Sequence, residues 1–258
     1  MWLRRVFRLL AFIPALCAGW EPVLGQSADL VTDRPDQTES AVTVAPGYLQ
    51  VETGVLLTRD NSAGRDLEAT ELLGTLVRIG ISERVELRVG FDGFVSEEIE
   101  RPAPRGRVDS DGFGDASLGA KLLLFEEDAA RPQAAMLIES SVPIGESEVS
   151  SDDYEPSVRL ALSKDLRNGV SIGWNGGLAR EEGDDILFYT LAAGFGLTDK
   201  NGAFLEVFGD SDDSHSIDVG WTYLVTPAAQ LDLAVGAGLS SEAPNWFLGA
   251  GISLRFPD

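Results

Sequence analysis

The single histidine of the chain, His215, is the first residue whose chemistry needs testing, because a serine nucleophile requires a base within hydrogen-bond reach. Ser214 and Ser216 flank this histidine, but neighbouring residues of an extended segment point to opposite faces. The next residue on the same face as His215 is Ile217, which carries no nucleophile. We therefore assign no catalytic residue and expect that the protein is not an enzyme.

Two acidic segments, GDSDDS and VDSDGFGD, offer oxygen atoms of the kind that Ca²⁺ prefers as ligands. An EF-hand loop also needs a Glu at its twelfth position, and counting from Asp210 or Asp109 reaches Trp221 or Ala120 instead. The Gly-x-x-x-x-Gly-Lys motif that cradles phosphates does not occur in the sequence either. We therefore predict no metal site and no cofactor.

Charged residues recur instead at alternating positions of short apolar segments. Val85, Leu87 and Val89 share one face of an extended chain, whereas Glu86 and Arg88 share the other. A period of two predicts a β-strand with one apolar and one polar face. About twelve such segments have the length of a barrel strand. They cover residues 47–58, 69–80, 84–95, 113–125, 133–142, 156–164, 169–179, 185–197, 202–209, 215–225, 229–239 and 245–256.

The links between these predicted strands are sorted by length. Every second link, starting after the first strand, is long and acidic, as in SEEIERPAPRGRVDSD and PIGESEVSSDDYEP. The links between them are mostly tight, as in SE, TDKN and TPAA. A membrane barrel whose termini share one side has short turns on that side and long loops on the other. A soluble acidic β domain is the simpler alternative, but it gives no reason for this sorting.

Membrane crossing, if it occurs, must use strands. No apolar run after residue 25 approaches the length of a spanning helix, and only helices and closed barrels satisfy every backbone group in lipid. The polar faces carry both signs of charge and many glycines, which suits a wetted lumen. The predicted fold is therefore all-β, a transmembrane antiparallel β-barrel of about twelve strands over residues 47–258, with periplasmic termini.

The N-terminus has the pattern of an export signal. Residues 1–25 form a predicted signal peptide, in which Arg4, Arg5 and Arg8 precede an apolar core too short to span a bilayer. Residues 26–46 then form a polar leader ahead of the barrel domain. The net charge of −22 argues against nucleic acid as a partner, since binding it needs clustered Lys and Arg.

Two interpretations stay open for the charged part of the leader, residues 33–40. It is either a solvated tail or a hatch, in which Pro35 fixes φ and the acids fold into the lumen to pair with Arg78, Arg88 or Arg255. The charges on the wall either brace the barrel as ion pairs or shape a permeation path. The residues predicted to line or gate the lumen are Asp33, Arg34, Asp36, Glu39, Glu52, Arg78, Glu86, Arg88, Asp92, Asp115, Lys121, Arg159, Glu206, Asp218, Asp232 and Arg255.

Three sequence motifs resemble one known family. TDRPDQTES followed by PGYLQVE resembles the opening of the outer-membrane transporter family named after the MetA pathway of phenol degradation. GFGDASLGAKLLL and SVPIG are similar to its Gly-x-Gly-Asp-x-x-x-Gly-x-Lys strand and its Pro-x-Gly strand end. The resemblance implies an outer-membrane barrel with a role in transport and does not identify a solute. The matching residues are Asp33, Arg34, Pro35, Asp36, Thr38, Glu39, Ser40, Pro46, Gly47, Gln50, Glu52, Gly112, Gly114, Asp115, Gly119, Lys121, Pro143 and Gly145.

These observations predict a monomeric, integral protein of a Gram-negative outer membrane that acts as a passive channel for small molecules, with hydrophobic or aromatic solutes among the candidates. The alternative is a non-transporting structural or surface-interaction barrel whose acidic loops are its functional part. The expected partners are the solute, outer-membrane lipid and the barrel-assembly machinery, which would recognise the last strand ending at Phe256.

Overall fold

The computed structural model describes residues 30–61, 66–101 and 106–257. The predicted signal peptide and the first residues of the leader lie outside these ranges. Apart from a three-residue 3₁₀ turn, η2 (Arg167–Gly169), every regular element in the described ranges is a β-strand. None of the described residues belongs to a helix that is long and apolar enough to cross a membrane.

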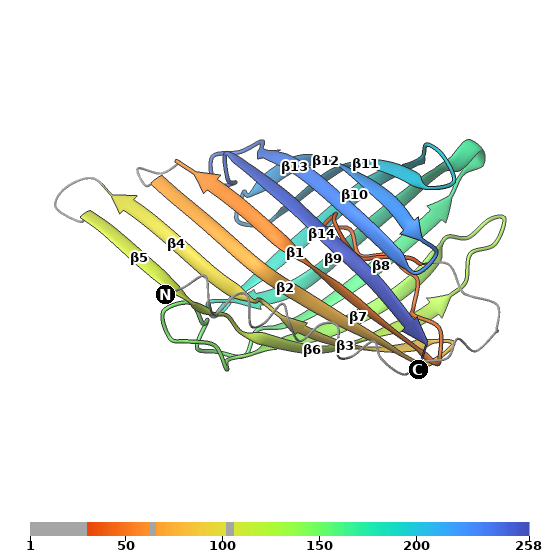
Figure 1. Ribbon diagram of the computed structural model, residues 1–258, viewed down its shortest axis with the longest axis horizontal. Coiled ribbons are helices and arrows are strands. Elements are labelled where there is room, and N and C mark those ends of the chain that lie inside the picture. The colour runs from red at the N-terminus through yellow and green to blue at the C-terminus, as the bar shows by residue number, and fades with distance from the viewer. Residues whose placement is uncertain (1–29, 62–65, 102–105, 258) are drawn as a thin grey trace.

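Fourteen strand segments form one antiparallel sheet, which closes because β1 pairs with both β2 and β14. The segments are β1 (Tyr48–Asp60), β2 (Asp66–Ser82), β3 (Val85–Phe91), β4 (Phe94–Arg101), β5 (Gly106–Phe113), β6 (Ala116–Phe125), β7 (Gln133–Val142), β8 (Pro156–Asp165), β9 (Val170–Glu181), β10 (Asp184–Gly196), β11 (Asn201–Asp210), β12 (His215–Thr226), β13 (Ala229–Gly238) and β14 (Trp246–Pro257). Figure 1 shows them side by side around the barrel.

The fourteen segments make twelve barrel strands, because two strands are each broken in the middle. β3 and β4 lie end to end along β2, and β5 and β6 continue one another along β4 and β3. The prediction of about twelve antiparallel strands is therefore confirmed. Beyond the break, β5 pairs with β4 alone, and this hairpin projects past the rest of the wall (Figure 1).

A glycine and two aspartates shape the breaks. Gly93 has a φ of +79°, and a Cβ there would lie 2.2 Å from the carbonyl oxygen of Leu72, so only glycine fits. The Asp92 amide donates to the carbonyl oxygen of Asp115 at 3.0 Å, while the Asp115 amide donates to the Asp92 carboxylate at 3.0 Å. These bonds keep the two broken strands in register across the interruption.

The apolar and polar faces of the wall point as predicted. Leu118 and Val219 are 57% and 47% exposed on the outside, whereas Arg78, Lys121 and Glu206 are fully buried inside. A barrel in water would reverse this order, since the hydrophobic effect drives apolar side chains inward. The outer surface is therefore built to contact hydrocarbon.

The strands extend further than predicted at one end of the barrel. We call the end where β1 begins and β14 ends the terminal rim, and the opposite end the far rim. The link predicted at 96–111 is largely strand, and the link predicted between β9 and β10 is a turn at Glu182–Gly183. The prediction of long loops was wrong there because strand pairing continues where both faces are polar. Arg107 of β5, for example, bonds to Glu98 of β4 at 2.5 Å.

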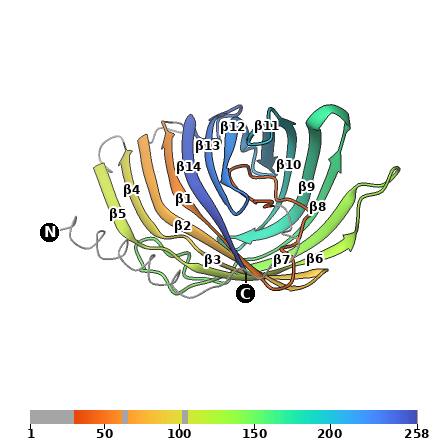
Figure 2. The same ribbon diagram turned by 45° about the vertical axis from the view of Figure 1, so that its right-hand side comes forward.

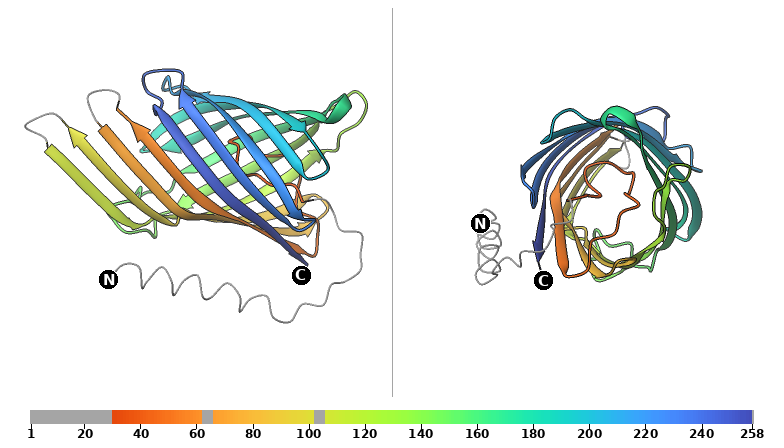
Figure 3. Two further views of the ribbon diagram at one scale, coloured as in Figure 1. Left: turned by 45° about the horizontal axis from the view of Figure 1, so that its top comes forward. Right: turned by 90° about the vertical axis from the view of Figure 1, so that its right-hand side faces the viewer.

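The interior of the barrel holds the leader. Residues 30–46 run inside the ring of strands as an irregular trace, visible in red and orange in the end-on view of Figure 3 and between the walls in Figure 2. At the terminal rim the leader enters β1 through Gly47, whose φ is +78°. The core of the molecule is therefore a polar lumen filled in part by its own N-terminal segment.

Candidate functional site: the lumen and its leader

The wall of the lumen contains a cluster of three cations, in which Glu52 and Glu86 lie 3.0 and 2.8 Å from Arg78 and Glu86 lies 3.2 Å from Arg88. Arg78 of β2 lies directly opposite Arg88 of β3 in the sheet register, and both are almost completely buried. Like charges in directly opposed positions repel one another. Lys121 of β6, also fully buried, adds a third cation beside Glu86. We call Arg78, Arg88 and Lys121 the basic wall.

Asp33 of the leader adds an anion that contacts all three cations. Its Oδ2 lies 3.1 Å from Arg78 Nη1, 2.7 Å from Arg88 Nη1 and 2.8 Å from Lys121 Nζ. Burial alone would raise the pKa of Asp33, but Arg78, Lys121 and Arg88 together hold this pKa well below its usual value. Asp33 is thus an ionised side chain shared by three strands. Glu39 lies on the same cluster, with Oε1 2.7 Å from Arg88 Nη2.

Two wall carboxylates position the leader backbone next to the basic wall. Glu52 Oε2 accepts hydrogen bonds from the amides of Asp33 and Arg34, each at 3.0 Å. Glu86 bonds to Arg78 Nε at 2.8 Å and accepts from the amide of Val44 at 2.7 Å. Charged acceptors give strong hydrogen bonds to backbone amides, so these residues fix both ends of the leader segment.

The middle of the leader reaches the opposite side of the lumen. Thr38 Oγ1 lies 2.6 Å from Thr190 Oγ1 of β10 and donates to Glu206 of β11 at 2.5 Å. The amide of Glu39 donates to Asn175 Oδ1 at 2.7 Å, and Asn175 Nδ2 donates back to the carbonyl of Glu39 at 3.0 Å. The leader therefore spans the lumen from the basic wall to β9, β10 and β11.

Arg34 points to a third part of the wall. Its Nη2 lies 3.3 Å from Asp232 Oδ1 of β13. Its side chain occupies the space above Gly54 and Gly251, where an added Cβ would come within 2.4 to 2.5 Å of the guanidinium. The two glycines thus provide the room that the arginine needs.

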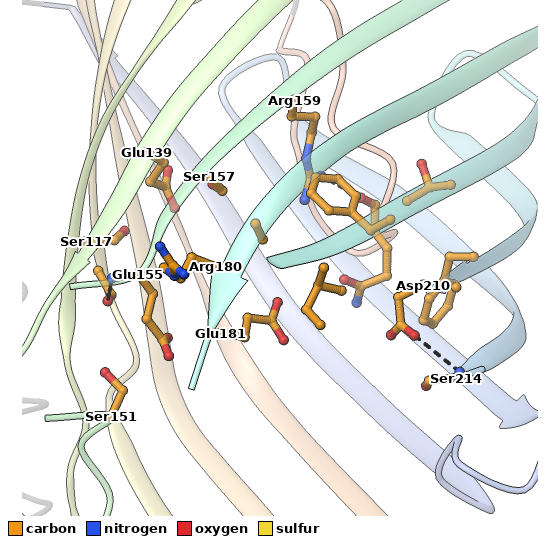
Figure 4. Close-up of a pocket in the computed structure, with 18 of the residues that line it drawn as sticks. Ser117, Glu139, Ser151, Glu155, Ser157, Arg159, Arg180, Glu181, Asp210 and Ser214 are labelled. Atoms are coloured by element: carbon orange, nitrogen blue, oxygen red, sulfur yellow. Dashed lines mark hydrogen bonds between the residues drawn. The ribbon is translucent and has the colours of Figure 1, made fainter. Parts of the chain in front are cut away.

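Above the leader, a cavity of about 530 Å³ is open towards the far rim. We call it the vestibule. Gln37 and Thr190 line it from the leader side, and Phe188 and Phe208 lie on one wall. Figure 4 shows several of its acidic and hydroxyl side chains converging from β7, β8, β9 and β11. Its charged residues are the carboxylates of Asp92, Asp115, Glu139, Glu155, Glu181 and Asp210 and the guanidinium groups of Arg159 and Arg180.

Three predicted residues have separate surroundings. Arg159 Nη1 donates to the carbonyl of Gln37 at 3.0 Å, and its guanidinium carbon lies 4.8 Å from the ring centre of Phe188. Arg255 lies over Tyr48 at the terminal rim, with 5.3 Å between its guanidinium carbon and the ring centre. Asp115 accepts from the Gly145 amide at 2.9 Å and so anchors the segment 143–155.

The other predicted residues of the wall face the lumen from two groups of strands. Glu52, Arg78, Glu86, Arg88 and Lys121 contact the leader cluster, as described above. Glu206, Asp218 and Asp232 occupy β11, β12 and β13 and are almost completely buried. Asp92 lies at the strand break, and Asp36 is half-buried in the leader beside Gln37.

Some contact residues were not among the predictions. Asn175 and Thr190 hold the leader, and Glu139 bonds to Arg88 Nε at 3.4 Å. Each occupies the polar parity of its strand, so alternation would have placed it in the lumen. The amide of Asn175 and the hydroxyl of Thr190 are neutral and give no charge signal, whereas the charge of Glu139 could have identified it.

The closed twelve-stranded barrel, with its apolar exterior and its internal polar leader, defines the class of outer-membrane β-barrels. The family profile described as "Putative MetA-pathway of phenol degradation" matches residues 32–256, and the chain belongs to this family. The expected family is therefore confirmed. No curated protein matches the sequence.

Solved structures with the same fold include channels and a translocator domain. The COG4313 outer membrane channel from Pseudomonas putida F1 is 14% identical, with a TM-score of 0.64 over 84% of this chain and 98% of that one. The KdgM porin in complex with disordered oligogalacturonate is 9% identical, with a TM-score of 0.53 over 81% and 99%. The NalP translocator domain from Neisseria meningitidis is 11% identical, with a TM-score of 0.53 over 98% and 95%. At these identities the likeness is one of fold.

Proposed function

We propose that the barrel is an outer-membrane channel for the passive passage of small molecules and that the leader constricts it. The observation that carries this proposal is the vestibule, which opens towards the far rim and ends on Gln37 of the leader. A cavity that leads to a segment held only by non-covalent contacts is what a gated pore requires. We place the far rim outside the cell and the termini in the periplasm.

The size of the barrel supports a narrow passage. Eight-stranded barrels are filled by side chains, whereas porins of sixteen strands or more hold wide aqueous channels. Twelve strands with an internal segment fall between these cases. The family description, which refers to phenol degradation, brings aromatic compounds into consideration, and Phe188 and Phe208 offer ring contacts in the vestibule.

The competing proposal is a barrel without transport, braced by its own leader. The number of ion pairs on Asp33 favours it, since such a cluster stabilises the wall whether or not a solute passes. In neither proposal does a residue of this chain act as a catalyst. A monomer and assembly through the C-terminal strand, in which Phe256 lies opposite Leu49, belong to both proposals.

Planar-bilayer recording separates the two functions. The purified protein should form single channels, and a variant that lacks residues 26–40 should show larger single-channel conductance because the lumen loses its constriction. Heat-modifiable mobility on gels would verify that the variant folds as a barrel. Equal conductance of the two proteins would reject the leader as a constriction. No channels from either protein at any voltage would favour the structural barrel.

A further inference from the structure

The charged side chains on the two sides of the lumen differ in whether they form ion pairs. On the basic wall, each cation has a carboxylate within 3.1 Å. On the other side, Glu206 of β11, Asp218 of β12 and Asp232 of β13 form an acidic strip, which we call the acidic lane. Among the described residues, the ion pair with Arg34 at 3.3 Å is the one salt bridge that these three carboxylates form.

Buried polar atoms without partners gather along this lane. Asp218 and Asp232 are 3% and 4% exposed, yet Asp218 Oδ1 and Asp232 Oδ2 have no hydrogen-bond partner within the described part of the chain. Ser253 Oγ of β14 and Arg34 Nε are in the same situation. A buried carboxylate oxygen without a donor is costly, so these positions require water or a cation.

The leader contacts the lane at two points. Gln37 donates its amide to Glu206 at 2.7 Å, and Arg34 bonds to Asp232. Between these contacts lies Asp36, and Asp218 faces this stretch without an ion pair within the described ranges. The pKa of Asp36 is raised well above its usual value, mainly by burial and to a smaller extent by the nearby carboxylates of Glu206 and Asp218. Such a shift is expected where several carboxylates lie close together.

Aromatic rings border the lane. An added Cβ at Gly220 would lie 2.1 Å from the Phe204 ring, and one at Gly236 would lie 2.0 Å from the Phe247 ring, so each ring lies directly against the lumen side of a glycine. Ring faces attract cations, as Arg159 over Phe188 illustrates in the vestibule above. Carboxylates and ring faces together suit inorganic cations and organic ammonium ions.

We propose that the acidic lane holds small cations beside the leader and that the channel therefore prefers small cations, including aromatic ammonium ions, to anions. This inference rests on the proposed channel function and adds to it the charge class of the solute. The lining of the vestibule is also mainly acidic, because it contains six carboxylates and only two guanidinium groups. Fixed negative charge along a narrow path raises the local concentration of cations and repels anions.

Reversal potentials in a KCl gradient test the proposal. The wild-type channel should show a permeability ratio of K⁺ to Cl⁻ well above one, and Asp218→Asn and Asp232→Asn should each move this ratio towards one. Glu148→Gln, which removes an exposed carboxylate from the segment 143–155, is the matched control and should leave the ratio unchanged. Benzylammonium and benzoate, which share a ring and differ in charge, should show the same preference for the cation.

Anion preference, or lane variants that leave the ratio at the wild-type value, would overturn the proposal while leaving the channel function intact. If no channels form, the channel function fails, and the lane is then judged by anomalous scattering from crystals soaked in Rb⁺. Density beside Asp218 and Asp232 would support a cation site there, and density at neither carboxylate would overturn it. Heat-modifiable mobility would establish that each variant is a folded barrel.

Discussion

The basic wall and the acidic lane are parts of one lumen with opposite construction. Arg78 and Arg88 are placed opposite one another by strand register, and Asp33 bonds to both of them in addition to the wall carboxylates Glu52 and Glu86. Glu206 and Asp218 are also brought face to face by register, but no cation of the described chain pairs with them. The difference shows that one side of the barrel is completed by the leader, whereas the other is left for water or a solute to complete.

The largest effect is expected from Asp33→Ala, which removes the shared anion of the basic wall. Breaking a buried ion pair costs roughly 3–5 kcal/mol when the remaining charge stays buried without a partner. We expect the free energy of unfolding in urea with lipid vesicles to fall by about 3 kcal/mol, the lower end of that range, because Arg78 and Arg88 keep Glu52 and Glu86 as partners. The single-channel conductance should rise to that of the protein without residues 26–40.

Asp36→Ala provides the comparison within the leader. Asp36 makes no ion pair within the described ranges and lies among other carboxylates, so its removal should leave the free energy of unfolding unchanged or raise it. If Asp33→Ala and Asp36→Ala destabilised the barrel equally, the contrast between the two sides of the lumen would be wrong.

A second, smaller change in conductance is expected at low pH. Asp33 has a depressed pKa when the leader is docked, so its contribution to docking is fully present above the pKa of a free aspartate, about 4, and is lost as the pH falls below that value. Conductance should therefore rise when recordings at pH 7 are repeated near pH 3. The charged groups that face Asp33 are Arg78 on β2, Arg88 on β3, Lys121 on β6, Glu52 on β1 and Glu39 of the leader.

Asp33→Asn isolates this group from the other carboxylates. The amide cannot titrate, so the variant should already conduct more at pH 7 and should show little further rise in acid. A rise in acid as large as that of the wild-type protein would assign the effect to other carboxylates.

The smallest effect is expected from Gly251→Ala on the lane side. The added Cβ would lie 2.5 Å from Arg34 Nε, and its three nearest atoms all belong to the Arg34 side chain, which can move. The shift would pull Arg34 away from Asp232 and leave this carboxylate unpaired. The permeability ratio of K⁺ to Cl⁻ should therefore rise slightly, with barrel stability unchanged.

Gly249→Ala is the matched control on the same strand. Its added Cβ would meet Leu56 at 3.7 Å, an ordinary contact, so selectivity should not change. Equal shifts in both variants would mean that the Arg34–Asp232 pair does not influence permeation.

The sequence predicted the wall better than the contents of the lumen. Alternation in segments such as residues 85–91 was sufficient to assign the outward and inward faces, because lipid and water impose a strict period of two. The alternation is weak at the far rim, where both faces of β4 and β5 are polar. The predicted strands therefore ended too early there. The breaks at Gly93 and Asp115 depend on local backbone bonds that alternation does not report.

Pairing inside the lumen depends on register and therefore could be predicted only in part. Charge alone suggested Arg78, Arg88 and Arg255 as partners of the leader acids. Asp33 bonds to the first two, whereas Arg255 lies at the terminal rim over Tyr48, because it comes near the end of the last strand. Which cation lies at the depth of the leader depends on the stagger of all twelve strands.

The position of the leader is tested most directly by a reversible cross-link. Thr38 Oγ1 and Thr190 Oγ1 are 2.6 Å apart, so Thr38→Cys combined with Thr190→Cys should form a disulfide on oxidation. We predict that both thiols are then protected from a maleimide reagent, that conductance stays at or below the wild-type level, and that it reaches the wild-type level on reduction. Thiols that remain reactive after oxidation, or a cross-linked protein that conducts like the variant without residues 26–40, would contradict the account.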